Sequence, residues 1–400
     1  MARVPIDRDG AAGREPTTVP FTDVGAMAGE IWPEIERDYL ACLLNGAYIG
    51  GPAVTAFERD WAAYCGADHA VGLANGTDAL QLSLTALGVS PGDEVVVPAN
   101  TFIATAAAVV RAGATPRFAD VSDGTLLMTP DTLAEAITPR TRVVIIVHLY
   151  GQMPDMDGLL ATAQRAGIAV IEDAAQAHGA EWDGRRAGSF GVAACFSFYP
   201  AKNLGAFGDA GAVVTSRPEL ADRIRSLANH GRSHGQSHYE HDSIGINSRL
   251  DALQAFVLRG KLAHLDEWTE RRIALASRYR ELLGSCEFRG TGLKLTATAP
   301  AARHAYHLFV VRVARRDSVR AKLAQRGIQT GVHYPVPCHE QPPLRRFAAH
   351  PLPVAERAAG EILSLPMFPH MTDRQVDYVC ESLPGALRAT AVRPEAADVH

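Results

Sequence analysis

The chain has 400 residues, of which 47% are hydrophobic and 21% are charged, and its formal net charge is −5. This length and composition indicate a globular protein with a large core and more than one domain. The negative charge, together with the lack of a dense basic cluster, argues against a nucleic-acid-binding protein. No apolar run is long enough to cross a membrane, and no signal-peptide pattern is seen. The six cysteines are scattered without a CxxC pair, so we expect a reducing, cytoplasmic location.

Helical and strand-like segments alternate through the first half of the chain. The spacing of apolar residues predicts helices over 31–44, 55–64, 79–87, 104–112 and 158–166. Short apolar runs predict strands over 70–73, 93–97, 142–147 and 168–171. Such alternation implies an α/β fold with a mainly parallel sheet covered by helices on both faces.

The second half predicts a smaller α/β domain. A single long helix is expected from Asp251 through Leu283, followed by strands over 307–313 and 328–332. The predicted division is an N-terminal tail at 1–18, a large domain at 19–250, a linking helix with a small domain at 251–387, and a C-terminal tail at 388–400.

Two residues of the large domain have the chemistry of a cofactor site. Lys202 lies among small and apolar residues, which should lower the pKa of its amine. Asp173 follows the predicted strand at 168–171, and open α/β sheets bind ligands at the carboxyl ends of their strands. A lysine amine can form a Schiff base with pyridoxal phosphate, and a carboxylate can keep the pyridine nitrogen protonated. Each residue alone is more often a surface lysine or a helix N-cap, but together they favour this cofactor.

A phosphate site is expected where the chain enters the predicted helix at 79–87. Gly76 and Thr77 would place free backbone N–H groups and the positive end of the helix dipole at that point. Thr77 and Asp78 are alternatively ordinary N-cap residues. Ser197 could add a hydroxyl to the same phosphate, and Phe102 could either stack on a planar ring or pack in the core. The motifs of P-loop and dinucleotide-binding proteins do not occur.

Seven motifs resemble the DegT/StrS family of pyridoxal-phosphate-dependent sugar aminotransferases, which has the fold type I (aspartate aminotransferase-like) architecture. The resemblance extends from Val19 to Leu383. The motifs occur in family order: Asn75-Gly-Thr-Asp-Ala-Leu80, Pro98-Ala-Asn-Thr-Phe-Ile-Ala104, His148-Leu-Tyr-Gly151, Glu172-Asp-Ala-Ala-Gln-Ala177, Ser197-Phe-Tyr-Pro-Ala-Lys-Asn-Leu-Gly205, Gly245-Ile-Asn-Ser-Arg-Leu-Asp251 and His333-Tyr-Pro335. The resemblance implies a large domain with a mainly parallel sheet and a smaller C-terminal α/β domain.

The resemblance also implies roles for individual residues around the cofactor ring. Lys202 is the Schiff-base lysine, and Asp173 pairs with the pyridine nitrogen. Gln176 contacts the phenolic oxygen, and Phe102 stacks on the ring.

For the phosphate, the resemblance implies residues from two chains. Gly76, Thr77 and Ser197 hold it from one subunit, and Asn247 reaches it from the neighbouring subunit. This arrangement implies a homodimer with shared active sites.

The reaction implied by the resemblance moves an amino group from L-glutamate to a keto-deoxysugar linked to a nucleotide, dTDP in our reading. The product would be an amino sugar for an antibiotic or another secondary metabolite. Arg249, His333, Tyr334 and His339 are the candidates for substrate contacts.

Three other functions compete with this one. An aminotransferase acting on a cyclitol ketone would have identical cofactor residues. Sugar dehydratases of the same family carry histidine in place of the lysine, so Lys202 argues against that reaction. A sensor built on the same fold would not need the complete catalytic set.

A cluster of four histidines also invites a metal-site interpretation: His230, His234, His238 and His241. Gly231 and Gly235 interrupt any helix there, and neither a carboxylate nor a cysteine completes a ligand set. We therefore expect a polar loop and no metal.

Overall fold

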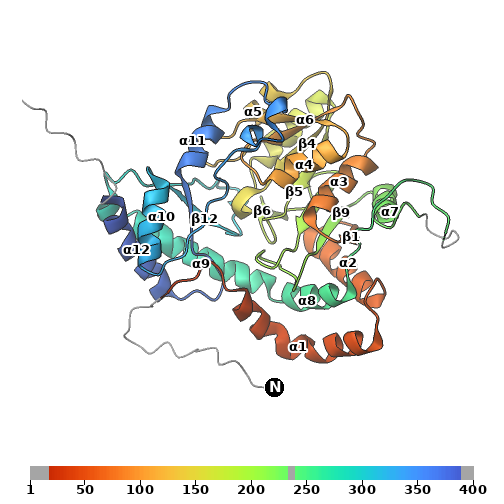
Figure 1. Ribbon diagram of the computed structural model, residues 1–400, viewed down its shortest axis with the longest axis horizontal. Coiled ribbons are helices and arrows are strands. Elements are labelled where there is room, and N and C mark those ends of the chain that lie inside the picture. The colour runs from red at the N-terminus through yellow and green to blue at the C-terminus, as the bar shows by residue number, and fades with distance from the viewer. Residues whose placement is uncertain (1–17, 233–238, 389–400) are drawn as a thin grey trace, which may run out of the picture.

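A seven-stranded sheet forms the centre of the computed structural model, which describes residues 18–232 and 239–388 (Figure 1). Its strands are β1 (His69–Leu73), β2 (Glu94–Pro98), β3 (Thr115–Ala119), β4 (Thr141–Val147), β5 (Ala169–Asp173), β8 (Ala193–Ser197) and β9 (Gly211–Thr215). They lie in the order β1-β9-β8-β5-β4-β2-β3. Only β9 runs against its two neighbours, and the other strands are parallel. The predicted mainly parallel sheet is therefore confirmed.

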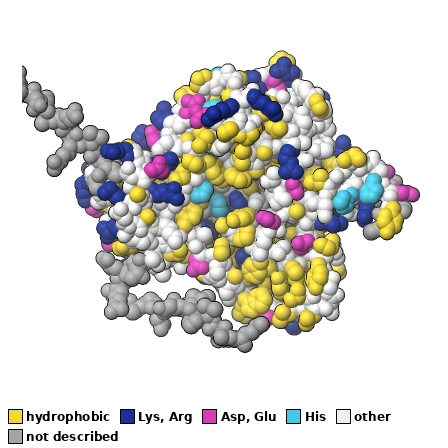
Figure 2. Space-filling model, in the orientation of Figure 1, with side chains coloured by type: hydrophobic (Ala, Val, Ile, Leu, Met, Phe, Trp, Pro, Cys, Tyr) yellow, Lys and Arg dark blue, Asp and Glu magenta, His cyan; other side chains and the backbone are white. Residues whose placement is uncertain are grey.

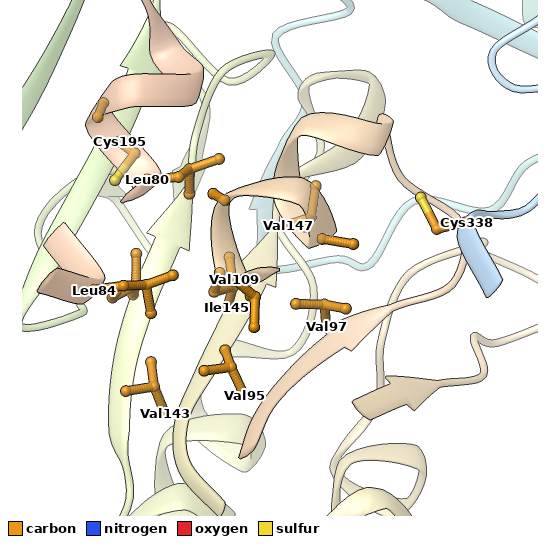
Figure 3. Close-up of a cluster of buried hydrophobic side chains, with 14 of the residues drawn as sticks. Leu80, Leu84, Val95, Val97, Val109, Val143, Ile145, Val147, Cys195 and Cys338 are labelled. Carbon is orange, nitrogen blue, oxygen red and sulfur yellow. The ribbon is translucent and has the colours of Figure 1, made fainter. Parts of the chain in front are cut away.

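Helices cover both faces of this sheet because successive residues of each buried strand point to opposite faces. The helices of this half are α1 (Val24–Asn45), α2 (Pro52–Cys65), α3 (Gly76–Ala86), α4 (Ile103–Arg111), α5 (Pro130–Ala136), α6 (Met156–Ala166), α7 (Pro218–Leu227) and α8 (Ala252–Leu262). Val143 and Ile145 pack with Leu84 of α3 and Val109 of α4 (Figure 3). Val144, between them in β4, belongs to the opposite core, which α2, α6 and α8 cover.

The C-terminal half has its own core around a three-stranded antiparallel sheet. Its elements are α9 (Leu265–Leu283), β10 (Lys294–Leu295), β12 (Phe309–Arg312), α10 (Arg316–Gln325), α11 (Pro353–Glu361), β13 (Ile362–Leu365) and α12 (Asp373–Arg388). Tyr279, Phe309, Leu323 and Val379 are buried in this core. A smaller sheet contains β6 (Glu181–Trp182), β7 (Arg185–Arg186) and β11 (Ala302–Arg303).

Two predicted elements of the C-terminal half differ from the structure. The single helix expected from Asp251 to Leu283 is two helices, α8 and α9, separated at residues 263–264. The break coincides with a contact to α1, where the Nε2 atom of His264 lies 3.1 Å from the Glu34 carboxylate. The expected strand at 328–332 is not formed, because this segment makes one bridge to Val19 and another to β13 instead of a continuous ladder.

The parallel strands bring the motifs of the sequence to one edge of the sheet. Asp173 ends β5 and Ser197 ends β8, and these two strands are parallel. The segments that follow β1, β2 and β4 leave the sheet at the same edge, because these strands share that direction. Within the described ranges, no helix is both long enough and apolar enough to span a membrane.

Candidate active site

A pocket of about 430 Å³ lies at the carboxyl edge of the sheet. The loops that follow β1, β2, β4, β5 and β8 form one side of it, and residues 307–308 and 333–334 contribute from the C-terminal half. Nine predicted site residues line this pocket: Gly76, Thr77, Phe102, Asp173, Gln176, Ser197, Lys202, His333 and Tyr334. The fold therefore brings together most of the residues that the sequence analysis identified as candidates for the site.

Lys202 lies in the loop between β8 and β9, with its side chain on the pocket wall. Its backbone N–H donates to the carbonyl oxygen of Tyr199 at 2.8 Å, which makes a tight turn just before it. Burial lowers the pKa of the Lys202 amine to about 8, although the negative charge of Asp173 acts in the opposite direction. The alternative of a surface lysine is thus wrong, and this amine can be neutral near physiological pH.

Asp173 is the last residue of β5 and is only 6% exposed. The Thr105 hydroxyl donates to its Oδ2 atom at 2.8 Å, and the backbone N–H of Ala175 donates to Oδ1 at 3.2 Å. Burial raises the pKa of the carboxyl, while these hydrogen bonds and the positive charge of Lys202 oppose the rise. The next helix in the described chain is α7, so Asp173 is not a helix N-cap. The two oxygens retain acceptor capacity toward the pocket.

The N-terminus of α3 meets the end of β8 at Gly76. The cap of this helix is Asn75, whose side chain accepts from the backbone N–H of Asp78 at 2.8 Å. The alternative of Thr77 or Asp78 as the N-cap is therefore wrong. A Cβ atom on Gly76 would lie 2.7 Å from the Cβ of Ser197, closer than real contacts allow. Glycine thus lets the helix N-terminus, a natural anion site, approach the Ser197 hydroxyl.

Aromatic and amide groups lie across the pocket from one another. Phe102 is 51% exposed, and its ring centroid lies 5.4 Å from that of Tyr334. Because half of the Phe102 side chain is accessible, the alternative of core packing is wrong. The Gln176 side chain donates to the Tyr334 hydroxyl at 3.1 Å and accepts from the backbone N–H of Tyr150 at 2.6 Å. Both ends of the Gln176 amide are therefore held in place.

Two histidines of the C-terminal half also line the pocket. The Nδ1 atom of His307 lies 3.2 Å from the Oδ1 atom of Asn203, the residue after Lys202. Burial, and then the charge of Lys202, hold the pKa of His307 well below its usual range. Burial followed by the same charge lowers the pKa of His333 to about 4. Both imidazoles are therefore neutral at pH 7 and face the pocket as hydrogen-bonding groups. Sequence reasoning missed His307, which it assigned only to a strand.

A fully buried pair, His148 and Glu172, supports the floor of the pocket. The Nε2 atom of His148 lies 2.9 Å from the Glu172 carboxylate. Glu172 also accepts backbone N–H groups from Gly188, Phe190 and Gly191 at 2.8–2.9 Å. Burial acts to raise the pKa of Glu172, but the hydrogen bond and charge of His148 together with these N–H groups lower it. Because the carboxylate only accepts, His148 carries its proton on Nε2.

Three predicted residues do not line the pocket of their own chain. His339 is 3% exposed, and its Nε2 atom lies 3.1 Å from Glu356. The expected substrate contact of His339 is therefore wrong, because its ring is packed away against α11. Arg249 donates to the Asn229 side chain at 3.0 Å, and Asn247 is exposed beside the same loop.

The histidine cluster falls partly outside the described residues, which exclude His234 and His238. The Nδ1 atom of His241 lies 2.9 Å from the carbonyl oxygen of His230. The expectation that this loop holds no metal stays a prediction.

These features match what pyridoxal phosphate requires of a protein. A partly buried lysine amine lies in the same pocket as a buried carboxylate. The N-terminus of α3 suits a phosphate, because Gly76 lets it lie close to Ser197. The accessible face of Phe102 suits a planar ring.

Comparisons with known proteins point in the same direction. The sequence model of the DegT/DnrJ/EryC1/StrS aminotransferase family matches residues 30–384. A Streptomyces venezuelae protein named dTDP-3-amino-3,4,6-trideoxy-alpha-D-glucose transaminase is 48% identical over 92% of this chain and 96% of its own.

Solved structures agree with this match. The crystal structure of S. venezuelae DesV has a TM-score of 0.88 and 47% identity, covering 94% of this chain and 100% of that one. The structure of NtdA from Bacillus subtilis, with bound cofactor PMP, has a TM-score of 0.87 and 33% identity, covering 94% of this chain and 86% of that one.

Proposed function

The chain belongs to the DegT/DnrJ/EryC1/StrS aminotransferase family, a pyridoxal-phosphate-dependent family, and on this basis we propose that it transfers an amino group from L-glutamate to a keto sugar carried on dTDP. The name of the S. venezuelae relative supports dTDP as the carrier and carbon 3 as the site of amination. The observation that carries the proposal is the Lys202 amine facing a pocket that also contains the buried Asp173 carboxylate.

Lys202 and Asp173 are the catalytic residues of this proposal. When bound, pyridoxal phosphate accepts the amino group and delocalises the negative charge that develops at the reacting carbon. Lys202 anchors the cofactor covalently, and its freed amine moves the proton at that carbon. A pKa of about 8 leaves part of the amine neutral at pH 7 and keeps it a competent base. Asp173 keeps the pyridine nitrogen protonated.

The other pocket residues hold the cofactor in the orientation that Lys202 requires. Gly76, Thr77 and Ser197, which line the pocket at the N-terminus of α3, would hold the phosphate. Phe102 would stack on one face of the ring, and Gln176 would donate to the phenolic oxygen. The hydrogen bonds that fix both ends of Gln176 support this assignment.

The sugar would enter from the side formed by the C-terminal half. His333 and Tyr334 lie there, and we propose that they contact the sugar. The rings of His333 and Phe21 stack with their centroids 5.6 Å apart, and together they form a flat aromatic wall of the pocket. A neutral imidazole beside a flat aromatic wall suits a deoxysugar, which offers both hydroxyl and apolar faces.

We further propose that the enzyme is a homodimer with shared active sites. Phe102 and Tyr199, on the pocket wall, are 51% and 55% exposed, and Ile49 and Ile244 are 57% and 96% exposed. Hydrophobic side chains also gather on the face of α1 in the lower part of Figure 2. A second copy would cover these surfaces and could bring its Asn247 to the phosphate.

An assay with a panel of ketones tests the proposed reaction. The purified protein is incubated with pyridoxal phosphate, L-glutamate and one acceptor, and the product is identified by mass. The acceptors are dTDP-linked 3-keto and 4-keto deoxysugars, a UDP-linked 3-keto sugar and a cyclitol ketone. We expect an amino product from the dTDP-linked 3-keto sugar at the highest kcat/KM. A product from the cyclitol alone would replace the sugar proposal with the cyclitol alternative.

A further inference from the structure

A second buried lysine lies behind the loop that carries Lys202. Lys261, on α8, is 1% exposed, and its Nζ atom donates to the carbonyl oxygen of Gly205 at 2.7 Å. The same atom lies 5.1 Å from the centroid of the Phe207 ring. Burial lowers the pKa of the Lys261 amine to about 8. It does not line the pocket and therefore does not reach the reacting atoms.

This position is an unfavourable one for a charged side chain. The neighbours of Lys261 on the same side of α8, Ala255 and Leu258, are apolar and belong to the core that also contains Leu204 and Ala206. Among the described residues, no carboxylate pairs with Lys261, so its burial costs free energy that an apolar residue would avoid. The hydrogen bond from its ammonium group to Gly205 gives a reason for a lysine at this buried position.

The loop that carries Lys202 is closed by hydrogen bonds between its own backbone groups. The backbone N–H of Ala206 donates to the carbonyl oxygen of Phe198 at 2.8 Å, which closes the loop around Lys202. A Cβ atom on Gly205 would lie 2.2 Å from the carbonyl oxygen of Pro200, so the two arms of the loop are in direct contact. A shift at Gly205 would therefore move the turn that carries Lys202.

Groups outside the loop hold it at three points. The Asn203 side chain donates to the carbonyl oxygen of Ala305 at 2.9 Å. Lys261 holds Gly205, and the Gln254 side chain accepts from the backbone N–H of Phe207 at 2.8 Å. Gln254 and Lys261 are two turns apart on α8 and thus lie on one face of that helix. Helix α8 therefore holds the chain on the C-terminal side of Lys202 through two polar side chains.

We propose that Lys261 is a positioning residue, which fixes the main chain at Gly205 and thereby sets where the Lys202 amine lies in the pocket. The inference rests on the proposed function only in assigning the cofactor to Lys202. It predicts that loss of the Lys261 N–H groups impairs the chemistry at Lys202 more than it impairs substrate binding or folding.

The substitution Lys261→Met tests this role, because methionine retains an unbranched apolar side chain without a donor. We expect kcat for amino transfer to fall by about tenfold, the size expected for loss of one hydrogen bond to a charged group. The KM for glutamate should stay within about twofold, because the substrate does not contact this residue. Lys261→Arg, which keeps a charged donor, should recover part of kcat. Lys294→Met, at an exposed position on β10, is the matched control and should leave both constants unchanged.

A second readout separates positioning from general stability. Apoprotein is mixed with pyridoxal phosphate, and borohydride-trapped label on the Lys202 peptide is followed over time at several pH values. In Lys261→Met, label should appear on Lys202 about tenfold more slowly, and the pH at which the labelling rate is half-maximal should differ from that of wild type. The melting temperature of the variant should stay within a few degrees of wild type.

Each outcome decides the proposal. Wild-type kcat and labelling in Lys261→Met would overturn it, and so would loss of folding in both Lys261 variants, since the residue would then be purely structural. If wild-type protein itself carries no label on Lys202, the proposed function fails, independently of Lys261.

Discussion

At the scale of single residues, Lys202 and Asp173 owe their chemistry to burial. Burial acts on the two groups in opposite senses: it lowers the pKa of the amine and raises that of the carboxyl. Each group also opposes the shift of the other, because their charges are of opposite sign. Thr105 and Ala175 add hydrogen bonds that favour the carboxylate form of Asp173. The pair therefore places an amine with a lowered pKa in the same pocket as a hydrogen-bonded carboxyl group.

The pKa of Lys202 predicts how attachment of the cofactor depends on pH. Only the neutral amine is nucleophilic, and with a folded-state pKa of about 8 its neutral fraction is one half at about pH 8 and approaches one about a unit higher. We expect the rate of covalent attachment to apoprotein to rise nearly tenfold per pH unit below 7 and to level off above 8.5. Stopped-flow absorbance measures this rate. A rate still rising tenfold per unit above pH 9 would contradict the burial of the amine.

The carboxylate of Asp173 can be tested by removing its charge alone. Asp173→Asn keeps the shape and the hydrogen bond from Thr105 but cannot hold a proton on the pyridine nitrogen. We expect kcat to fall by about a thousandfold, or about 4 kcal/mol in the barrier. Asp222→Asn, at an exposed position on α7, is the control and should be neutral. Near-normal kcat in Asp173→Asn would show that Asp173 is not the partner of the ring nitrogen.

Sequence reasoning identified residues whose local motif is informative and missed those whose role depends on distant contacts. Lys202 and Asp173 were predictable because each lies in a short motif next to a strand. Thr105 and His307 were not, because their partners, Asp173 and Asn203, are far away in sequence. His339 was placed in the pocket wrongly, because nothing local to it shows that its ring bonds to Glu356.

At the scale of elements, the proposed phosphate site depends on the contact between α3 and β8. Asn75 caps α3, and the missing side chain of Gly76 allows the first turn to lie against Ser197. Backbone N–H groups at this terminus have no partner within the helix. The site therefore depends on a close approach of two elements and not on a basic side chain.

A single methyl group should disturb this approach. In Gly76→Ala the new Cβ would lie 2.7 Å from the Cβ of Ser197 and 3.1 Å from its Cα, so the helix must shift. We expect the dissociation constant for pyridoxal phosphate to rise by about tenfold to a hundredfold, with a loss of stability of about 1–3 kcal/mol. Gly360→Ala is the control, because its Cβ on α11 would meet no atom within 4 Å. Equal cofactor affinity in the two variants would contradict the close-approach explanation.

Several helices and strands were predictable from the sequence, among them the edge strand β1, but the strands β3, β8 and β9 were not. The central β2 and β4 are continuous apolar runs, and both were predicted. The edge strand β3 contains Pro116 and was missed, since proline is tolerated at an edge and obscures the strand pattern. The break between α8 and α9 has no proline or glycine at residues 263–264, and it coincides with the contact between His264 and Glu34 of α1.

At the scale of the whole molecule, α8 packs in a core of the large sheet and α9 packs in the core of the C-terminal sheet. Figure 1 places α9 alongside the elements of the C-terminal sheet and α8 beside α1 and α2. The predicted domain boundary at residue 250 stays a prediction, and α8, which begins at Ala252, packs in a core of the large sheet. The Asp123 carboxylate connects the halves through Arg312, at 2.8 Å, and Arg357. These ion pairs link the loop after β3 to β12 and α11.

The proposed dimer can be tested by complementation. Lys202→Ala removes the anchor, and Asn247→Asp places a negative charge next to the phosphate, so we expect each homodimer to be nearly inactive. Co-expressed chains form heterodimers in which one site has both lesions and the other has neither, if Asn247 serves the partner. Purified heterodimers should then recover roughly half of the wild-type activity per dimer. No recovery would mean that Asn247 acts within its own subunit.

The most direct measurement of the central claim is the fate of Lys202 when glutamate is added. Protein loaded with pyridoxal phosphate is reduced with borohydride, either directly or after incubation with L-glutamate, and its peptides are analysed by mass. Our account predicts a modification on Lys202 in the direct sample and its near-complete loss after glutamate, since the donor releases the lysine. A modification on another lysine, or one on Lys202 that glutamate does not remove, would contradict it.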